Sequence, residues 1–399
     1  MIGPSGRPRG WSVAAFVLGL GAGMALVWTF GFVDIWLRGI PSNDFSAIWA
    51  GPRILAAGGD PYDPGTFRSS SEALGVLAPA TPVYIYPGWV AVILAPFGAL
   101  DLRAAAIVWI VLGLLVASAG LLTFLEVQPV RSPVVHALLA FTLVASEPGI
   151  VAFYSGQADF LIVGGLAFMA AGLSSGRLGP AGVVGCVMLL KPQLFSLAAP
   201  ALVGLELARG RRRFVYALVA SAAALALLST LVVPQWWSAW LTYVPAARAA
   251  DLRAATLPNA MRDVFGAAGA VTAYGLLAAS IALAFRFGRS RAALAVWLMV
   301  SMSVSPYLWV YDHIVGIVPL AMASAMRAER SERAAILIAL AGASVLTVAA
   351  TLLHAFPGQE HRTLSFNGFA QFGLTALVVL ALWPLRREQA GPGARPGRS

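Results

Sequence analysis

The chain has 399 residues, of which 59% are hydrophobic and only 11% are charged. A soluble domain carries roughly 25% charged residues, so this composition excludes an ordinary soluble protein. The formal net charge of +10 would fit a nucleic-acid partner. The arginines fall instead in short segments between apolar runs, where they set membrane orientation. Several charge-free runs are long enough to cross a bilayer as helices, so the sequence predicts an all-α polytopic membrane protein without nucleic acid.

The first predicted span covers residues 11–32. Arg7 and Arg9 precede it, which places the N-terminal residues 1–10 in the cytoplasm and the following segment outside. The apolar run is too long for a signal peptide and no small-residue cleavage site follows, so we interpret it as a retained anchor. A long external loop, about residues 34–103, comes next. Its apolar stretch 89–100 is short for a span and is typical of a re-entrant or interfacial helix.

If residues 89–100 do not cross, eleven further spans follow and both termini lie inside. They cover about residues 104–125, 133–154, 158–173, 179–190, 194–207, 214–233, 265–285, 292–307, 314–326, 334–353 and 369–385. With this topology every arginine-dense loop lies on the cytoplasmic side. Residues 11–385 then form a single transmembrane domain. The cytoplasmic tail, residues 386–399, is rich in Gly, Pro and Arg, and we expect it to be disordered.

Polar side chains gather in the loops that this topology places outside. Among them are Asp44, a few residues beyond the first span, and Lys191, the only lysine in the chain. A carboxylate at this position is well placed to meet a substrate carried by a lipid. The alanine- and arginine-rich composition indicates a bacterial protein, and we expect the polar face on the outside of the cytoplasmic membrane.

Several short patterns follow one another in a characteristic order. They are Asp44-Phe45, Gly59-Asp60-Pro61-Tyr62, Tyr86-Pro87, Gly156-Gln157, Lys191-Pro192-Gln193, Ser305-Pro306-Tyr307 and Tyr311-Asp312. Together they resemble glycosyltransferase family 87, whose members have the GT-C membrane fold and take sugars from polyprenyl phosphate. The resemblance implies a GT-C-like fold with about twelve transmembrane helices and membrane-parallel helices in the first external loop. It also implies an inverting hexosyltransferase of cell-envelope glycolipid biosynthesis, such as a mannosyltransferase.

The resemblance makes Asp44 the catalytic base. A base must lie within hydrogen-bond reach of the acceptor hydroxyl, outside the membrane but near the lipid headgroups, and Asp44 meets this topological requirement. The alternative is that Asp44 caps the helix that follows it, since aspartate and asparagine are common at helix N-termini.

Three basic residues are candidates for binding the donor phosphate. They are Lys191, Arg262 and His313. A cation facing the phosphate would offset the charge that grows on the leaving group. Each has a structural alternative. Lys191 would snorkel to the membrane surface, Arg262 would pair with Asp263, and His313 would form an interfacial pair with Asp312.

A further set of polar residues is expected to line the sugar or acceptor pocket. The set comprises Asp60, Tyr62, Gln157, Asp159, Tyr311, Asp312, His361 and Arg362. Turn formation explains Asp60 and Tyr62 equally well, because the surrounding Gly-Gly-Asp-Pro-Tyr-Asp-Pro is rich in turn residues. The alternative for Gln157 is that it caps the helix that follows it or packs against a neighbouring helix.

We expect no metal and no cofactor. The external loops lack the clustered carboxylates that divalent ions prefer, and no phosphate-loop or dinucleotide motif is present. The predicted function is transfer of a sugar such as mannose from polyprenyl phosphate to a lipid or glycan acceptor. The alternative is a transporter or flippase for a glycolipid. It would have internal repeats and polar groups at the membrane midplane.

Overall fold

The computed structural model describes residues 10–76, 84–128, 132–249, 255–305, 307–326 and 360–387. Every regular element in these residues is a helix. The first half contains α1 (Gly10–Thr29), α2 (Phe32–Gly39), η1 (Ile40–Ser42), α3 (Asp44–Ala56), α4 (Pro64–Ala73), α5 (Gly88–Ile93), η2 (Ala95–Ala99), α6 (Leu102–Val127), α7 (Pro133–Ala145), α8 (Glu147–Ser155), α9 (Asp159–Ser174), α10 (Leu178–Gly185) and η3 (Cys186–Leu190). The second half contains η4 (Pro192–Phe195), α11 (Ala198–Ala208), α12 (Arg212–Val232), α13 (Trp236–Ala249), α14 (Leu257–Phe285), α15 (Ala293–Val304), η5 (Val310–Gly316), α16 (Ile317–Met326), α18 (Glu360–Leu382) and η6 (Trp383–Arg387).

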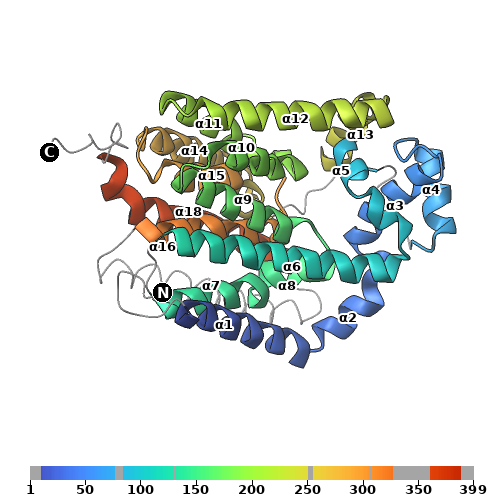
Figure 1. Ribbon diagram of the computed structural model, residues 1–399, viewed down its shortest axis with the longest axis horizontal. Helices are drawn as coiled ribbons and strands as arrows, with labels where there is room; N and C mark the ends of the chain where they lie inside the picture. Colours follow the sequence, from blue (N-terminus) through green and yellow to red (C-terminus); the bar gives the residue numbers. More distant parts are fainter. Residues whose placement is uncertain are drawn as a thin grey trace.

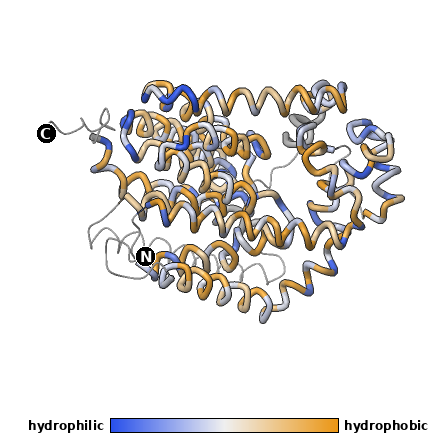
Figure 2. The backbone as a smooth tube through the Cα atoms, in the orientation of Figure 1, coloured by the Kyte–Doolittle hydropathy of each residue, from blue (hydrophilic) through white to orange (hydrophobic). Residues whose placement is uncertain are grey.

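The long helices run roughly along the longest axis of the molecule (Figure 1). Helices α3, α4 and α5 lie together at one end of this axis, whereas α1 begins and α18 ends towards the other. The long helices are mostly apolar, and hydrophilic stretches concentrate near the two ends (Figure 2). This distribution is the one expected for helices that cross a bilayer and leave their connections in water.

Five helical segments in the described residues are long and apolar enough to span a membrane. They cover Gly10–Thr29, Leu102–Val127, Arg212–Val232, Leu257–Phe285 and Asn367–Arg386. A sixth is possible if the bent pair α7 and α8 counts as one span. The prediction of an all-α polytopic membrane protein is therefore confirmed. The number of twelve stays a prediction, because the other apolar helices are shorter and the expected span 334–353 lies outside the described residues.

Glycines allow the close approach of α6 and α9. A Cβ atom on Gly120 of α6 would collide with the backbone of Gly164 on α9, and one on Gly164 would collide with Val116. Small residues at such contacts let two helix backbones pack closely where lipid supplies no hydrophobic driving force. The contact fixes the N-terminal end of α9, which carries Asp159.

Breaks in several expected spans shape the interior. The expected span 133–154 bends by 46° between α7 and α8, where Ser146 is extended and its hydroxyl accepts a hydrogen bond from the amide of Gly149. The expected spans 179–190 and 194–207 are interrupted by the 3-10 segments η3 and η4. Helix α14 begins at Leu257, before the expected start at residue 265, and kinks at Gly266. Such breaks place polar backbone and side chains inside the helical bundle.

The segment predicted to be the first external loop folds into short helices. Residues 89–100 form α5 and η2, which have six and five residues and are too short to cross a bilayer. Hydrogen bonds from two side chains hold this segment on α3: the indole Nε1 of Trp49 donates to the carbonyls of Phe97 and Leu100, and the Arg53 guanidinium donates to the carbonyl of Gly98. The expected cytoplasmic N-terminus and most of the tail, residues 388–399, lie outside the described residues.

Candidate active site

Asp44 is the first residue of α3 and does not serve as its cap. The neighbouring Asn43 is the N-cap, and its side-chain oxygen accepts a hydrogen bond from the amide of Ser46 at 3.3 Å. The side-chain Nδ2 of Asn43 donates to the carbonyl of Tyr154 at 3.0 Å, which ties the start of α3 to the end of α8. The alternative that Asp44 caps α3 is therefore wrong, because Asn43 is the cap. The Asp44 carboxylate is left to make contacts across the fold.

The Asp44 carboxylate is hydrogen-bonded by Gln157 and by Tyr311. Nε2 of Gln157 donates to Oδ2 of Asp44 at 2.7 Å, and the glutamine side chain is buried. Gly156 makes this geometry possible, because it ends α8 in the left-handed conformation with φ 64°. A side chain there would collide with Phe45, so the position needs glycine for both its backbone and its space. The carbonyl of Gly156 accepts a hydrogen bond from the Trp109 indole at 2.9 Å.

Lys191 lies at the break between η3 and η4 and is almost completely buried. Its Nζ donates to Oδ2 of Asp159 at 2.7 Å and to Oδ1 of Asp312 at 2.6 Å. The other oxygen of Asp312 accepts a hydrogen bond from the amide of Trp309 at 2.7 Å. Nζ also lies 4.4 Å from the centre of the Tyr311 ring. Buried charges are stable only when paired and hydrogen-bonded, and this triad satisfies that condition for the lysine.

The carboxylate of Asp44 and the lysine triad belong to one electrostatic neighbourhood. Burial raises the pKa of Asp44 above its usual range, while the Gln157 hydrogen bond and the Lys191 charge oppose the increase. Residue Asp44 as a whole is half-buried, so its carboxyl group has some access to the surroundings. A base with a raised pKa that is still reachable suits proton transfer near neutral pH.

A small cavity of about 60 Å³ lies beside this neighbourhood. Lys191 is the charged residue of its lining, and apolar side chains such as Ile48, Trp109 and Leu161 form most of the rest. Tyr86 also lines it. A volume of this size holds a few water molecules but no lipid-linked sugar.

Two of the expected pocket residues, Asp60 and Tyr62, make hydrogen bonds that stabilise their own loop. Oδ1 of Asp60 accepts a hydrogen bond from the amide of Tyr62 at 2.9 Å, which is a turn contact. The buried Tyr62 donates its hydroxyl proton to the carbonyl of Tyr86 at 2.6 Å. Both residues therefore shape the loop that presents Tyr86 to the cavity. The sequence had shown Tyr86 only as part of a Tyr-Pro pattern and not as a site residue.

The remaining candidates are less closely connected to the cluster. Arg262 is exposed on α14, and His313 is buried in η5, where its ring hydrogen-bonds the backbone of Ala255. Nε2 of His313 has no partner among the described residues. His361 and Arg362 lie in α18, but their side chains are outside what the structure describes. The structure thus brings together Asp44, Gln157, Asp159, Lys191, Tyr311 and Asp312.

No group of three or more His, Cys, Asp or Glu side chains with metal-binding geometry occurs in the part of the chain that the structure describes. Asp159 and Asp312 point to the lysine ammonium, which occupies the position that a cation would take between them.

Comparison with known proteins gives one match. The family model of glycosyltransferase family 87 matches residues 84–310, more than half of the chain. The matched stretch includes Gln157, Asp159 and Lys191, whereas Asp44 precedes it and Asp312 follows it by two residues. Neither a comparison with curated proteins nor one with solved structures finds a match. The resemblance predicted from short ordered patterns is confirmed: the chain belongs to glycosyltransferase family 87 and is a membrane glycosyltransferase.

Proposed function

We propose that the chain transfers a hexose from a polyprenyl-phosphate donor to a lipid or glycan acceptor, with inversion at the anomeric carbon and with Asp44 as the general base. The observation that carries the proposal is the state of the Asp44 carboxylate. Asn43 caps α3, so the Asp44 carboxylate is not used as a helix cap. It accepts a hydrogen bond from Gln157 at 2.7 Å, and Lys191 is close enough for its charge to affect the pKa of Asp44.

The proposed reaction moves one proton and one glycosyl group. Asp44 takes the proton of the acceptor hydroxyl, and the acceptor oxygen forms a bond to the anomeric carbon. The bond between that carbon and the donor phosphate oxygen breaks, and polyprenyl phosphate leaves with the electron pair. The leaving phosphate gains one unit of negative charge, so a nearby cation stabilises the transition state.

Lys191 has a restricted part in this reaction. An ammonium group has three N–H donors, and Asp159 and Asp312 occupy two of them. The cavity is lined by apolar atoms, so Lys191 contributes its aliphatic stem to it. The third donor would meet a phosphate oxygen only after the surrounding helices separate. The principal role of Lys191 in our proposal is to hold the two carboxylates together, and phosphate binding is secondary. Arg262 and His313 remain proposed phosphate contacts that require movement towards the cluster.

We place the reaction on the extracytoplasmic face of a bacterial cytoplasmic membrane, with both termini inside. The placement rests on the distribution of arginine in the sequence. The arginine-rich turns between α11 and α12 and between α14 and α15 lie near the end of the molecule opposite α3 (Figure 1). Membership of a glycosyltransferase family favours the enzyme over the transporter or flippase alternative.

The pH dependence of transfer tests the role of Asp44. We expect kcat/KM of the purified protein, supplied with a polyprenyl-phosphate hexose, to fall at acid pH with an apparent pKa above that of an exposed aspartate. The Gln157→Leu variant removes a hydrogen bond that lowers this pKa. Because the base then binds its proton more tightly, the acid limb of the profile moves to higher pH.

A matched control is Gln371→Leu, a buried glutamine on α18 that has no contact with Asp44. Its acid limb should coincide with that of the unchanged protein. An acid limb that stays in place in Gln157→Leu, or moves to lower pH, would contradict the assignment of the titrating group to Asp44.

A further inference from the structure

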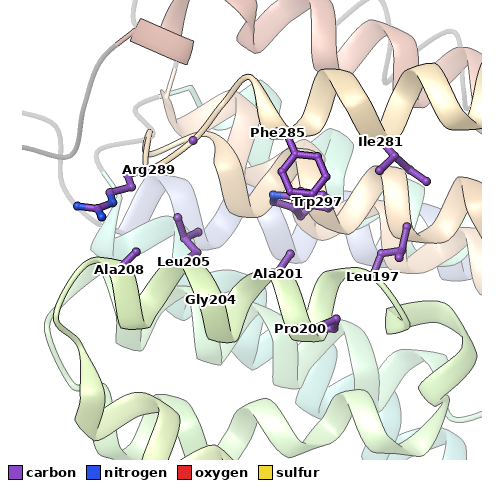
Figure 3. Close-up of a pocket in the computed structure, with 11 residues that line it drawn as sticks. Leu197, Pro200, Ala201, Gly204, Leu205, Ala208, Ile281, Phe285, Arg289 and Trp297 are labelled. Atoms are coloured by element: carbon purple, nitrogen blue, oxygen red, sulfur yellow. The ribbon is translucent and has the colours of Figure 1, made fainter.

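An apolar groove lies between α11 and the turn that joins α14 to α15, and none of the candidate active-site residues lines it (Figure 3). Its volume is about 440 Å³. The floor is formed by small residues of α11, namely Ala201, Gly204 and Ala208, and Phe285 and Trp297 contribute aromatic rings. The groove is larger than the cavity at Lys191 and is long enough to hold part of a hydrocarbon chain.

A cation stands at one end of this groove. Arg289 lines it and is exposed, and Figure 3 shows its guanidinium directed away from the apolar floor. Among the residues that the structure describes, the Arg289 side chain has no hydrogen bond and no ion pair. An arginine without a protein partner at the end of an apolar groove is arranged like an amphipathic binding site, with a charged head position and an apolar tail position.

The position of Arg289 is fixed by a neighbouring arginine. The guanidinium of Arg209 donates to the carbonyl of Arg289 at 3.0 Å and to that of Ser290 at 2.6 Å. Arg209 is itself paired with the buried Glu206 at 2.6 Å, and Arg211 pairs with the other oxygen of that glutamate at 3.3 Å. Arg209 thus holds the turn and Arg211 is paired with Glu206, whereas the Arg289 side chain remains available to a ligand.

We propose that this groove binds an anionic phospholipid, with one acyl chain along α11 and the phosphate paired with Arg289. The site is independent of the sugar-transfer reaction. The free energy gained when an acyl chain moves from the bilayer into an apolar groove is small, because lipid tails are already surrounded by hydrocarbon. Selectivity must therefore come from the charge at the groove end, and a net negative headgroup is favoured by the surrounding arginines. The arginine-rich turns place the site in the cytoplasmic leaflet.

Native mass spectrometry of the full-length protein, purified in detergent and supplied with phosphatidylglycerol or phosphatidylcholine, tests the proposal. We expect one phosphatidylglycerol to be retained in preference to phosphatidylcholine. The Gly204→Leu variant should lose this retention, because a Cβ atom at this position meets nothing within 4 Å and a larger side chain there would occupy the groove. Arg289→Gln should reduce the preference for the anionic lipid about fivefold.

The matched control is Gly21→Leu, an exposed helical glycine of α1 with equally open space around it. It should bind lipid as the unchanged protein does. The proposal is overturned if both lipids are retained equally, or if Gly204→Leu retains phosphatidylglycerol. It is also overturned if added polyprenyl phosphate displaces phosphatidylglycerol, or if no lipid is retained because another segment of this chain fills the groove.

Discussion

Replacing Asp44 by asparagine is expected to abolish sugar transfer while the protein still folds. Asparagine has nearly the same shape and still accepts the Gln157 hydrogen bond through its side-chain oxygen, but it cannot take a proton from an acceptor hydroxyl. A positioned general base contributes about 10²–10⁴-fold to a rate, so we expect a loss within this range or beyond it. The measurement is transfer from a polyprenyl-phosphate hexose by the purified protein, with the thermal unfolding midpoint recorded alongside.

Asp63→Asn is the matched control for this experiment. Asp63 is exposed in the same part of the chain and caps α4 by accepting a hydrogen bond from the amide of Thr66 at 2.7 Å. Asparagine caps a helix about as well as aspartate, so both activity and stability should be retained. Full activity in Asp44→Asn would remove Asp44 from the mechanism, and another base would have to be found in the cluster.

Replacing Lys191 by methionine is expected to destabilise the protein severely. The substitution leaves Asp159 and Asp312 buried without the cation between them, and breaking a buried ion pair in this way costs about 3–5 kcal/mol. The free energy of unfolding in detergent, or the unfolding midpoint, measures the effect. This expectation differs from a simple loss of donor binding, because the lysine is committed to two carboxylates.

The triple variant Lys191→Met, Asp159→Asn, Asp312→Asn separates charge from packing. Its three side chains are close in size to the originals but carry no charge, so we expect it to recover most of the lost stability. If the triple variant is as unstable as Lys191→Met alone, the packing around the lysine and not its charge determines stability. A triple variant with normal donor saturation would argue against any contact between Lys191 and the phosphate.

The membrane class and much of the site were predictable because they depend on local composition. Arginine in short segments and long charge-free runs identify a polytopic helical protein without any tertiary information. The lysine stood out as the only one in the chain, and Asp44 stood out by following the first span. The shortness of the apolar stretch 89–100 likewise predicted that it does not cross, and the structure divides it into the short helices α5 and η2.

The interactions within the site were not predictable, because they join distant parts of the chain. Lys191 contacts Asp159 across 32 positions and Asp312 across 121, and no local pattern records such pairings. The choice between Asn43 and Asp44 as helix cap was also open, since both residue types cap well. The interruption at Lys191 was predicted from the polar residue and the proline that follows it. The bend at Ser146 was not, because hydropathy reports an apolar run but not its bends.

The configuration of the product sugar tests the central claim most directly. Purified protein in proteoliposomes would be supplied with a panel of polyprenyl-phosphate hexoses of known anomeric configuration, and the glycosylated product examined by NMR. We predict transfer with the anomeric configuration opposite to that of the donor, since one carboxylate base and a departing phosphate give a single displacement. Retention of configuration, or transfer from a nucleotide sugar in the absence of any lipid-linked donor, would contradict the account.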